Sequence, residues 1–480
     1  MANDLDSRLD RMFNPRTMVI VGDKHASGFM WLRNNQTFTG KLYSVQIDER
    51  EIPGIEQLGV PNYKSLLDIP DEIDYVVVAV PRQIAPRIVK DCIAKGVAGC
   101  TLFTSGFAET EEEEGVHLQR TITEMAREAK LPLIGPNCMG VHNPKLGVRH
   151  SVDQPYGPDA GGSVGFISQS GTHAGFFTQC APEQGVRVSK SVSFGNAVVL
   201  DVADYLDYLA NDPETEVIAM YLEGVRDGRR FVDVLRKTTA RKPVVVWKGG
   251  QSEAGQRAIY SHTASLAAPT AVWNAIMRQA GAITADNIDE TLDAVQALVL
   301  AKPGTKKAAA LIAMTGGQSV SITDAFAKYG IDVPRLSQTS YDKLAEFFNI
   351  IGGSYRNPLD AGGTIGGGIG LGNLERVLNI LDEDENVGVI AIELSIGFQA
   401  RRWQNHPDRF TAMLDAICAF RDRSAKPLVT IMHPAHLEAL AIDVRHQVQA
   451  RGLPAFASFE RAARALSKAL DYHRYRAGLD

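Results

Sequence analysis

The chain has 480 residues, enough for about three domains of ordinary size. Hydrophobic residues make up 45% of it and charged residues 22%, proportions close to the globular average that exclude a largely disordered chain. The formal net charge of −6 argues against a broad nucleic-acid-binding surface, although it leaves room for a local basic pocket.

Membrane and secretory signals are absent from the sequence as read. The longest aliphatic runs, such as residues 76–80, are far too short to span a bilayer, and the N-terminal MANDLDSRLD has no apolar core of a signal peptide. The five cysteines (92, 100, 138, 180 and 418) are scattered and form no CxxC pair, which suits a reducing compartment. We therefore expect a soluble cytoplasmic protein without a metal site, whose partners include neither nucleic acid nor a membrane.

Short β-branched runs alternate with helical patterns along the chain. Eight runs predict buried strands: 17–22, 75–80, 163–168, 217–222, 243–248, 308–314, 387–394 and 427–432. Segments with helical periodicity lie between them, for example 231–239 and 409–420. Continuous apolar strands that alternate with helices predict an α/β fold with parallel sheets covered on both faces.

Two stretches without periodicity predict domain boundaries. One is the Pro- and Gly-rich segment 143–162, and the other is AKPGTKK at 301–307. We expect three α/β domains at 1–145, 150–300 and 305–480. The second and third share a Gly-rich first turn, a strand that ends in an acid and a Lys-Pro strand start, and we interpret them as a diverged duplication.

The first domain opens like a nucleotide-binding βαβ unit, because Gly22 and Gly28 follow the first strand. GDKHASG is not the GxGxxG fingerprint, however, and Asp48 is the nearest candidate for a ribose-binding acid, so a dinucleotide is disfavoured. A tight turn would explain the two glycines equally well. Three further small or polar loops follow strands in this domain: 80–83, 104–109 and 135–140. Together the four loops predict a ligand crevice at one edge of the sheet.

The second domain has a polar turn at Ser168-Gln169-Ser170-Gly171-Thr172, between a strand and a helix. Backbone N–H groups and the helix dipole would face an anion there, although such a turn is often only a helix cap. Glu223 ends a buried strand and therefore belongs to the ligand edge of the same sheet.

The least ordinary stretch is GGQSEAGQRAIYSHTASLA at 249–267, where a connection of two to six residues would suffice. It contains one histidine, His262, among Ser, Thr, Gly and Ala. A lone histidine is more often structural than catalytic. A neutral imidazole is nonetheless nucleophilic near pH 7, and a carboxylate on its far nitrogen would fix its tautomer.

Taken together, these stretches resemble the nucleoside-diphosphate-forming acyl-CoA synthetases, relatives of the succinyl-CoA synthetase α subunit. The 248–267 segment matches the family's phosphohistidine segment, and further signatures match at 135–140, 167–172, 193–196 and 221–224. The resemblance implies a Rossmann-like CoA-binding domain followed by two flavodoxin-like doubly wound parallel-sheet domains.

The resemblance also implies a role for each matching residue. His262 would be the phosphohistidine, and Glu223 would orient and activate it. The phosphate would be held by Ser168, Ser170, Gly171 and Thr172. Coenzyme A would be held by Gly22, Lys24, Ser27, Gly28, Val80, Pro81, Ser105, Gly106 and Asn137.

The implied activity is ADP-forming ligation of a small carboxylic acid to CoA, through an acyl phosphate and a phosphohistidine. In this family an ATP-grasp region binds ATP or ADP and Mg²⁺, and we expect it here as a separate β subunit in an α₂β₂ assembly. Two alternatives stay open: a catalytically silent CoA- or acyl-CoA-binding regulatory protein, and a related acyl or carbamoyl transferase subunit.

Overall fold

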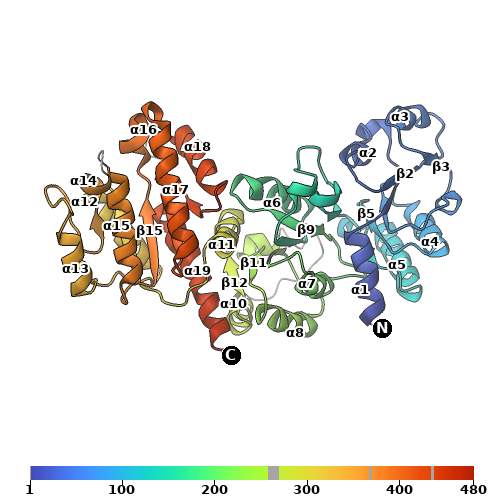
Figure 1. Ribbon diagram of the computed structural model, residues 1–480. Coiled ribbons are helices and arrows are strands. Elements are labelled where there is room, and N and C mark those ends of the chain that lie inside the picture. Colours follow the sequence, from blue (N-terminus) through green and yellow to red (C-terminus); the bar gives the residue numbers. More distant parts are fainter. Residues whose placement is uncertain (1, 258–269, 367–369, 434–436, 480) are drawn as a thin grey trace. The chain divides into compact units, whose positions relative to one another are not determined.

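The structure is a computed structural model that describes residues 2–257, 270–366, 370–433 and 437–479 (Figure 1). It is an α/β fold with three mainly parallel sheets. The chain divides into two compact parts, which we call unit 1 (residues 1–182 and 187–288) and unit 2 (residues 183–186 and 289–480). No helix in the described ranges is both long and apolar enough to cross a membrane.

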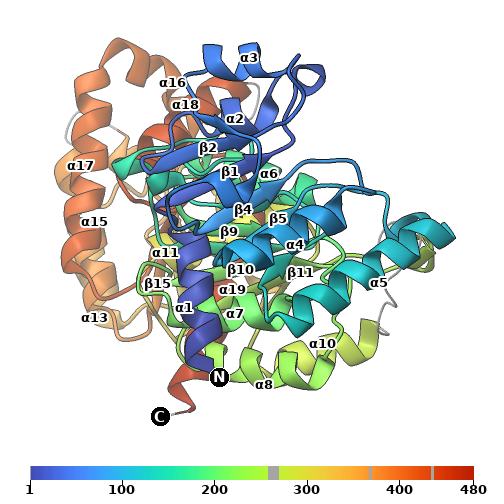
Figure 2. The same cartoon turned by 90° about the vertical axis from the view of Figure 1, so that its right-hand side faces the viewer.

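The first sheet of unit 1 is wholly parallel, with the order β3-β2-β1-β4-β5-β6, and Figure 2 shows its central strands side by side. This is the Rossmann strand order. The strands are β1 (Thr17–Val21), β2 (Lys41–Val45), β3 (Asn62–Tyr63), β4 (Tyr75–Val78), β5 (Gly99–Leu102) and β6 (Leu133–Ile134). The accompanying helices are α1 (Ala2–Phe13), α2 (Met30–Asn34), α3 (Ile52–Gln57), α4 (Ala85–Lys95) and α5 (Glu113–Glu128).

The second sheet of unit 1 has the order β12-β11-β10-β8-β9-β7. Its strands are β7 (Gly140–His142), β8 (Val164–Ser168), β9 (Val188–Ser193), β10 (Val217–Leu222), β11 (Val244–Lys248) and β12 (Ile283–Ala285). Only β7 is antiparallel, and the other five follow the flavodoxin order 2-1-3-4-5. The helices are α6 (Gly171–Glu183), α7 (Val202–Asn211), α8 (Gly228–Thr239) and α10 (Thr270–Gln279).

Unit 2 contains a five-stranded parallel sheet in the order β14-β13-β15-β16-β17, again the flavodoxin order. Its strands are β13 (Ala309–Ala313), β14 (Leu359–Asp360), β15 (Val389–Glu393), β16 (Leu428–Ile431) and β17 (Ala455–Phe456). Its helices are α12 (Gly316–Lys328), α13 (Gln338–Ala345), α14 (Gly362–Ile365), α15 (Gly370–Glu383), α16 (Ile396–Asn405), α17 (Pro407–Arg423), α18 (Glu438–Gln449) and α19 (Phe459–Ala477). Helix α11 (Ile288–Leu300) begins at the last residue of unit 1.

The predicted fold class is confirmed: all eight buried runs are strands, and the two predicted helical segments lie in α8 and α17. The two flavodoxin-type sheets share one strand order, as a duplicated domain would, although the duplication itself stays a prediction. The domain limits expected at residues 145, 150, 300 and 305 also stay predictions.

The core of unit 1 is continuous between its two sheets. The ring of Phe13 in α1 stacks on Tyr208 in α7 with centroids 4.6 Å apart. The Tyr75 hydroxyl in β4 accepts a hydrogen bond from the Val141 N–H in β7 at 3.0 Å. Because side chains from both sheets share one packed interior, the loops at their strand ends are held in fixed positions toward one another.

Candidate functional site

A cavity of about 570 Å³ in unit 1 is lined by loops that follow strands of both sheets. The first sheet contributes the loops after β1, β4 and β5, together with residues 137–139. The second sheet contributes residues 169–172, which lie between β8 and α6. Ligands of open α/β sheets bind at the carboxyl ends of strands, and here two such edges line one space.

The loop after β1 begins with a glycine that no other residue could replace without strain. Gly22 has φ +84°, a left-handed conformation, and a Cβ at this position would lie 2.4 Å from Cγ1 of Val80. The absence of a side chain therefore lets the β1 and β4 loops approach each other closely. Gly28, farther along the loop, also has a positive φ (+65°), but a Cβ there would meet nothing within 4 Å.

Asp23, the second residue of this loop, points inward. It is 2% exposed, and its carboxylate accepts hydrogen bonds from the Ser27 hydroxyl at 3.0 Å and the Leu32 N–H at 2.9 Å. Burial raises the pKa of Asp23, and these hydrogen bonds oppose that shift. Asp23 therefore braces the loop from inside, while the neighbouring Lys24 lines the cavity.

The other loops of the first sheet are tied to one another by polar contacts. Arg82 donates to the Gly106 carbonyl at 2.6 Å, and the Thr104 hydroxyl donates to the Val80 carbonyl at 2.6 Å. The Asn137 N–H donates to the Thr104 carbonyl at 3.0 Å, and Asn137 itself has φ +60°. These contacts tie the loops after β4, β5 and β6 to one another along the wall of the cavity.

The residues expected to hold CoA fall into three groups. Those that line the cavity are Lys24, Val80, Pro81, Ser105 and Asn137. Gly22 lines an adjoining cavity of about 290 Å³ beside β1, β2 and β4, which shares Lys24, Val80 and Pro81 with the first. Ser27, Gly28 and Gly106 line neither cavity but belong to the loops that form them.

The residues expected to hold phosphate lie at the start of α6. Ser170, Gly171 and Thr172 line the cavity, where the N-terminal end of a 13-residue helix carries a positive partial charge. Ser168 is fully buried, and its hydroxyl donates to the Ser170 carbonyl at 2.6 Å. Ser168 therefore shapes the turn rather than lining the cavity.

Glu223 follows β10 and is 4% exposed. The side-chain oxygen of Gln169 accepts hydrogen bonds from the N–H groups of Glu223 at 2.8 Å and Gly224 at 3.0 Å, which joins the ends of β8 and β10. The Tyr221 hydroxyl donates to the Glu223 carboxylate at 3.3 Å, and the Lys248 ammonium donates to the Glu223 carbonyl at 2.7 Å. The end of β10 is thus held by Gln169 from the loop after β8 and by Lys248 at the end of β11, while Tyr221 of β10 itself contacts the carboxylate.

Beside Glu223 lies a histidine that sequence reasoning missed. The His173 ring in α6 lies against Tyr221 and Trp247, with centroid distances of 4.3 Å and 4.4 Å. Burial lowers the pKa of His173, although the charge of Glu223 acts in the opposite direction. Burial likewise lowers the pKa of Lys248. His173 directly follows the SQSGT turn, so its place in the sequence was a usable signal.

His262, the expected phosphohistidine, lies outside the described residues. Its role therefore stays a prediction, as do the roles of the other candidate site residues.

Comparison with known proteins places the chain in a family. Residues 16–144 match the family model of a CoA binding domain, and residues 161–298 match that of a succinyl-CoA ligase-like flavodoxin domain. The chain is 31% identical over 490 residues to the acetate–CoA ligase (ADP-forming) I subunit alpha of Pyrococcus furiosus, covering 98% of each chain. This chain belongs to the α-type ADP-forming acyl-CoA synthetases.

Two further relatives extend this assignment. The dinucleotide-forming acetyl-coenzyme A synthetase 1 of Candidatus Korarchaeum cryptofilum, solved with phosphate and ADP, superposes with a TM-score of 0.83 at 27% identity over 98% of this synthetase chain and 97% of its own. The acetate–CoA ligase (ADP-forming) I of Archaeoglobus fulgidus is 35% identical over 80% of this chain. The match spans 54% of that enzyme, so the chain covers about half the length of this relative.

Proposed function

We propose that the chain is the α subunit of an ADP-forming acyl-CoA ligase, an acid–thiol ligase. It would convert a carboxylic acid, CoA and ATP into acyl-CoA, ADP and phosphate, and the reverse, through an acyl phosphate and a phosphohistidine at His262. The observation that carries the proposal is that the loops of the sheet in the CoA binding domain and the N-terminus of α6 line one and the same cavity. Glu223 directly follows β10, and its N–H donates to Gln169, which lines the cavity.

The two adjoining cavities suit the shape of coenzyme A. The smaller one lies where a Rossmann-type sheet receives a nucleotide, at the carboxyl ends of β1, β2 and β4. The larger one leads from there to the start of α6. CoA would place its nucleotide in the first and its pantetheine arm in the second, with Lys24, at the shared wall, beside the diphosphate.

The start of α6 would hold the phosphate that attacks the thioester. Phosphate oxygen attacks the acyl carbon, the carbon–sulfur bond breaks, and CoA leaves as its thiolate, which gives an acyl phosphate. The His262 imidazole then attacks the phosphorus, and the acid leaves as a carboxylate. ADP finally accepts the phosphoryl group as the nitrogen–phosphorus bond breaks, which restores neutral His262 and gives ATP. Positioning and charge stabilisation, rather than further covalent chemistry, are what such transfers require.

Glu223 would hold the proton on the far nitrogen of His262 and stabilise the positive charge that develops there. The bonds from Gln169 to the N–H groups of Glu223 and Gly224 support this role, because they fix the strand end that carries the carboxylate. ATP or ADP and Mg²⁺ would be held by an ATP-grasp β subunit in an α₂β₂ assembly. The α-subunit name of the Pyrococcus relative and the ADP in the Korarchaeum complex support a partner of this kind.

The acyl half of the reaction can be tested without the partner. The chain alone, incubated with acetyl-CoA and ³²P-labelled phosphate, should acquire an acid-labile label, because this half needs no nucleotide. His262→Asn should abolish the label. The matched variant His117→Asn, at an exposed position on α5, should keep it. Labelling of His262→Asn at the wild-type rate would refute the proposal.

Glu223→Gln should slow labelling about 10- to 100-fold, because a charge-assisted hydrogen bond contributes about 1.5–3 kcal/mol. A wild-type rate in this variant would refute the role of Glu223 alone. If the chain binds CoA but stays unlabelled with either acetyl-CoA and phosphate or ATP and the cognate β subunit, the alternative of a silent CoA-binding protein is correct.

A further inference from the structure

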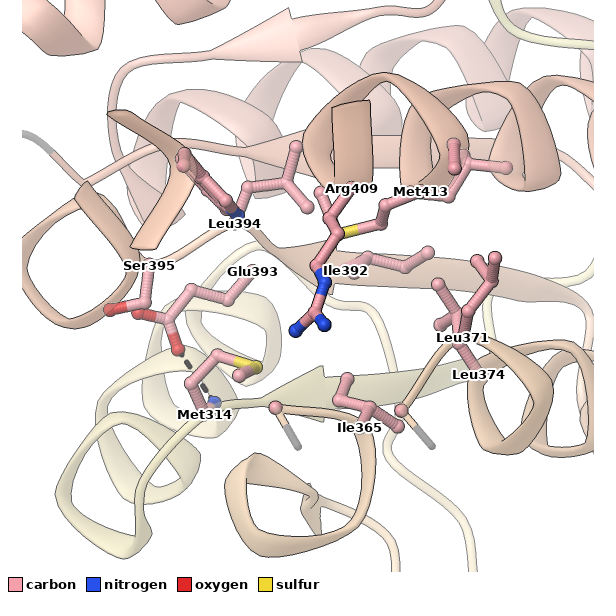
Figure 3. Close-up of a pocket in the computed structure, with 15 residues that line it drawn as sticks. Met314, Ile365, Leu371, Leu374, Ile392, Glu393, Leu394, Ser395, Arg409 and Met413 are labelled. Carbon is pink, nitrogen blue, oxygen red and sulfur yellow. Dashed lines mark hydrogen bonds between the residues drawn. The ribbon is translucent and has the colours of Figure 1, made fainter. Parts of the chain in front are cut away.

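Unit 2 contains a cavity of its own, of about 200 Å³, at the carboxyl ends of β13 and β15 (Figure 3). All of its lining residues belong to unit 2, and they come from the strand ends and from helices α14 to α17. In open α/β sheets this edge is where ligands bind. Neither family model reported above covers residues beyond 298, so nothing in those matches assigns this cavity a ligand.

Most of the cavity wall is apolar. Its main side chains are Ile365, Leu371, Leu374, Trp403, Met413 and Ile417. Such a wall favours a hydrocarbon or aromatic group, because its burial removes apolar surface from water. An apolar cavity of about 150 Å³ is known to hold benzene, so this one has room for a single ring or a branched chain with a few further atoms.

One cation enters this apolar space. The Arg409 guanidinium projects from α17 into the middle of the cavity (Figure 3). Arg409 is exposed to solvent, and within the described ranges its side chain forms no hydrogen bond or ion pair, so its N–H donors can exchange water for a ligand. A guanidinium presents donors in a planar fork, which matches the two oxygens of a carboxylate.

One anion with an unused oxygen lines the same space. Glu393 ends β15 and is 1% exposed. One of its carboxylate oxygens accepts the Met314 N–H at 2.9 Å. The other, Oε1, is buried without a hydrogen bond of good geometry among the described residues, and the Ser395 hydroxyl of the cavity wall is a donor beside this carboxylate. A carboxylate oxygen can accept more than one hydrogen bond, so Oε1 has room for a donor from a ligand in the cavity.

We propose that unit 2 is a binding site for a small carboxylate that carries an apolar or aromatic group and a hydrogen-bond donor. The ligand's carboxylate pairs with Arg409, its donor satisfies Oε1 of Glu393, and its apolar group fills the space lined by Leu374 and Trp403. An apolar amino acid and an apolar hydroxy acid share this chemistry, and they differ in whether the donor is an ammonium or a hydroxyl. This site is additional to the proposed ligase reaction and does not depend on it.

The test uses the full chain alone, without CoA, ATP or a partner, so its outcome is independent of ligase activity. The protein is labelled with 5-fluorotryptophan, and the Trp403 signal among the four tryptophans is assigned by Trp403→Phe. Fluorine NMR then follows titrations with L-phenylalanine, phenyllactate, 3-phenylpropionate and phenethylamine. L-Phenylalanine or phenyllactate should shift the Trp403 signal. The ligand of the two that binds more tightly shows whether the preferred donor is an ammonium or a hydroxyl. 3-Phenylpropionate, which lacks a donor, and phenethylamine, which lacks a carboxylate, should bind at least tenfold more weakly.

Three variants decide the assignment of the side chains. Arg409→Gln should weaken binding at least tenfold, whereas Arg356→Gln, an exposed arginine of the same unit that does not line the cavity, should leave it unchanged. Glu393→Gln should erase the preference for a donor-bearing ligand over 3-phenylpropionate. Ala412→Phe should fill the cavity and abolish binding without changing any charge. No shift of Trp403 with any carboxylate, or wild-type affinity in folded Arg409→Gln, would overturn the proposal.

Discussion

The hydrogen bonds that the Gln169 side chain accepts at the end of β10 can be removed by one substitution, and the resulting local loss of stability can be measured. In Gln169→Leu the side chain keeps nearly its volume but loses the oxygen that accepts from the N–H groups of Glu223 and Gly224. An unsatisfied buried donor costs about 1–3 kcal/mol, so two would cost about 2–6 kcal/mol. Because Gln169 lines the cavity, water can reach part of the site, and the loss should lie near the lower end, about 2 kcal/mol.

Amide hydrogen exchange, followed by mass spectrometry on peptides that span 221–228, measures this loss of stability at the end of β10. A local destabilisation of about 2 kcal/mol should speed exchange of the Glu223 and Gly224 amides by about 30-fold. Gln169→Glu keeps an acceptor and should exchange more slowly than Gln169→Leu. Gln57→Leu, at an exposed glutamine of the same unit, should match the wild type. Unchanged exchange in Gln169→Leu would refute the idea that this side chain fixes the strand end.

Two further substitutions test packing and charge in unit 1. Gly22→Ala should lower the free energy of unfolding by about 1–3 kcal/mol and weaken CoA binding, because the new Cβ would lie 2.4 Å from Val80 and the backbone would have to keep φ +84°. Urea unfolding measures the loss of stability, and a CoA titration measures the loss of affinity. Hydrogen bonds from Lys145 and Lys190 lower the pKa of Glu214 to about 2. A lowered pKa stabilises the fold above the unfolded value, so the stability advantage of wild type over Glu214→Gln should vanish as pH falls from about 4.5 to about 2.

Each of these predictions has a matched control. Gly28 also has a positive φ, but a Cβ there would meet open space, so Gly28→Ala should destabilise the fold less than Gly22→Ala does. If the two alanine variants are equally stable, close approach of the loops is not the reason for the glycine. Glu56→Gln, at an exposed position, should show the same acid sensitivity as the wild type. Equal acid sensitivity in Glu214→Gln would contradict the assigned ion pairs.

The buried strands could be predicted from the sequence because each is a run of Val, Ile, Ala or Leu covered on both faces, as in 217–222 and 389–393. The edge strands could not be predicted. Asn62–Tyr63 and Leu359–Asp360 have two residues each, and only pairing with a neighbouring strand defines them. The antiparallel β7 follows from its contact with β9, which no local pattern encodes.

The place of the candidate site was also predictable, because topology alone brings the carboxyl ends of parallel strands to one edge. The side-chain directions were not. Asp23 turns inward to brace its own loop, and Gln169 reaches across to the next strand. His173 lies one residue beyond the polar turn, yet only the packing against Tyr221 and Trp247 reveals that it stands beside Glu223. Spacing along the chain does not carry this information.

The two flavodoxin-type sheets show how similar strand ends acquire different chemistry. In the flavodoxin-type sheet of unit 1, Gln169 is the residue after β8. Its N–H donates to the Tyr221 carbonyl at 3.0 Å, and its side-chain oxygen accepts a hydrogen bond from the N–H of Glu223. In unit 2 the corresponding residue is Met314, which has no acceptor to offer, and its N–H is instead bonded by the carboxylate of Glu393. The acid of unit 2 thus does structural work that a glutamine and a main-chain carbonyl do in unit 1. A strand-end acid repeated in the sequence therefore does not imply a repeated phosphoryl-transfer site, and a different ligand for unit 2 is consistent with its contacts.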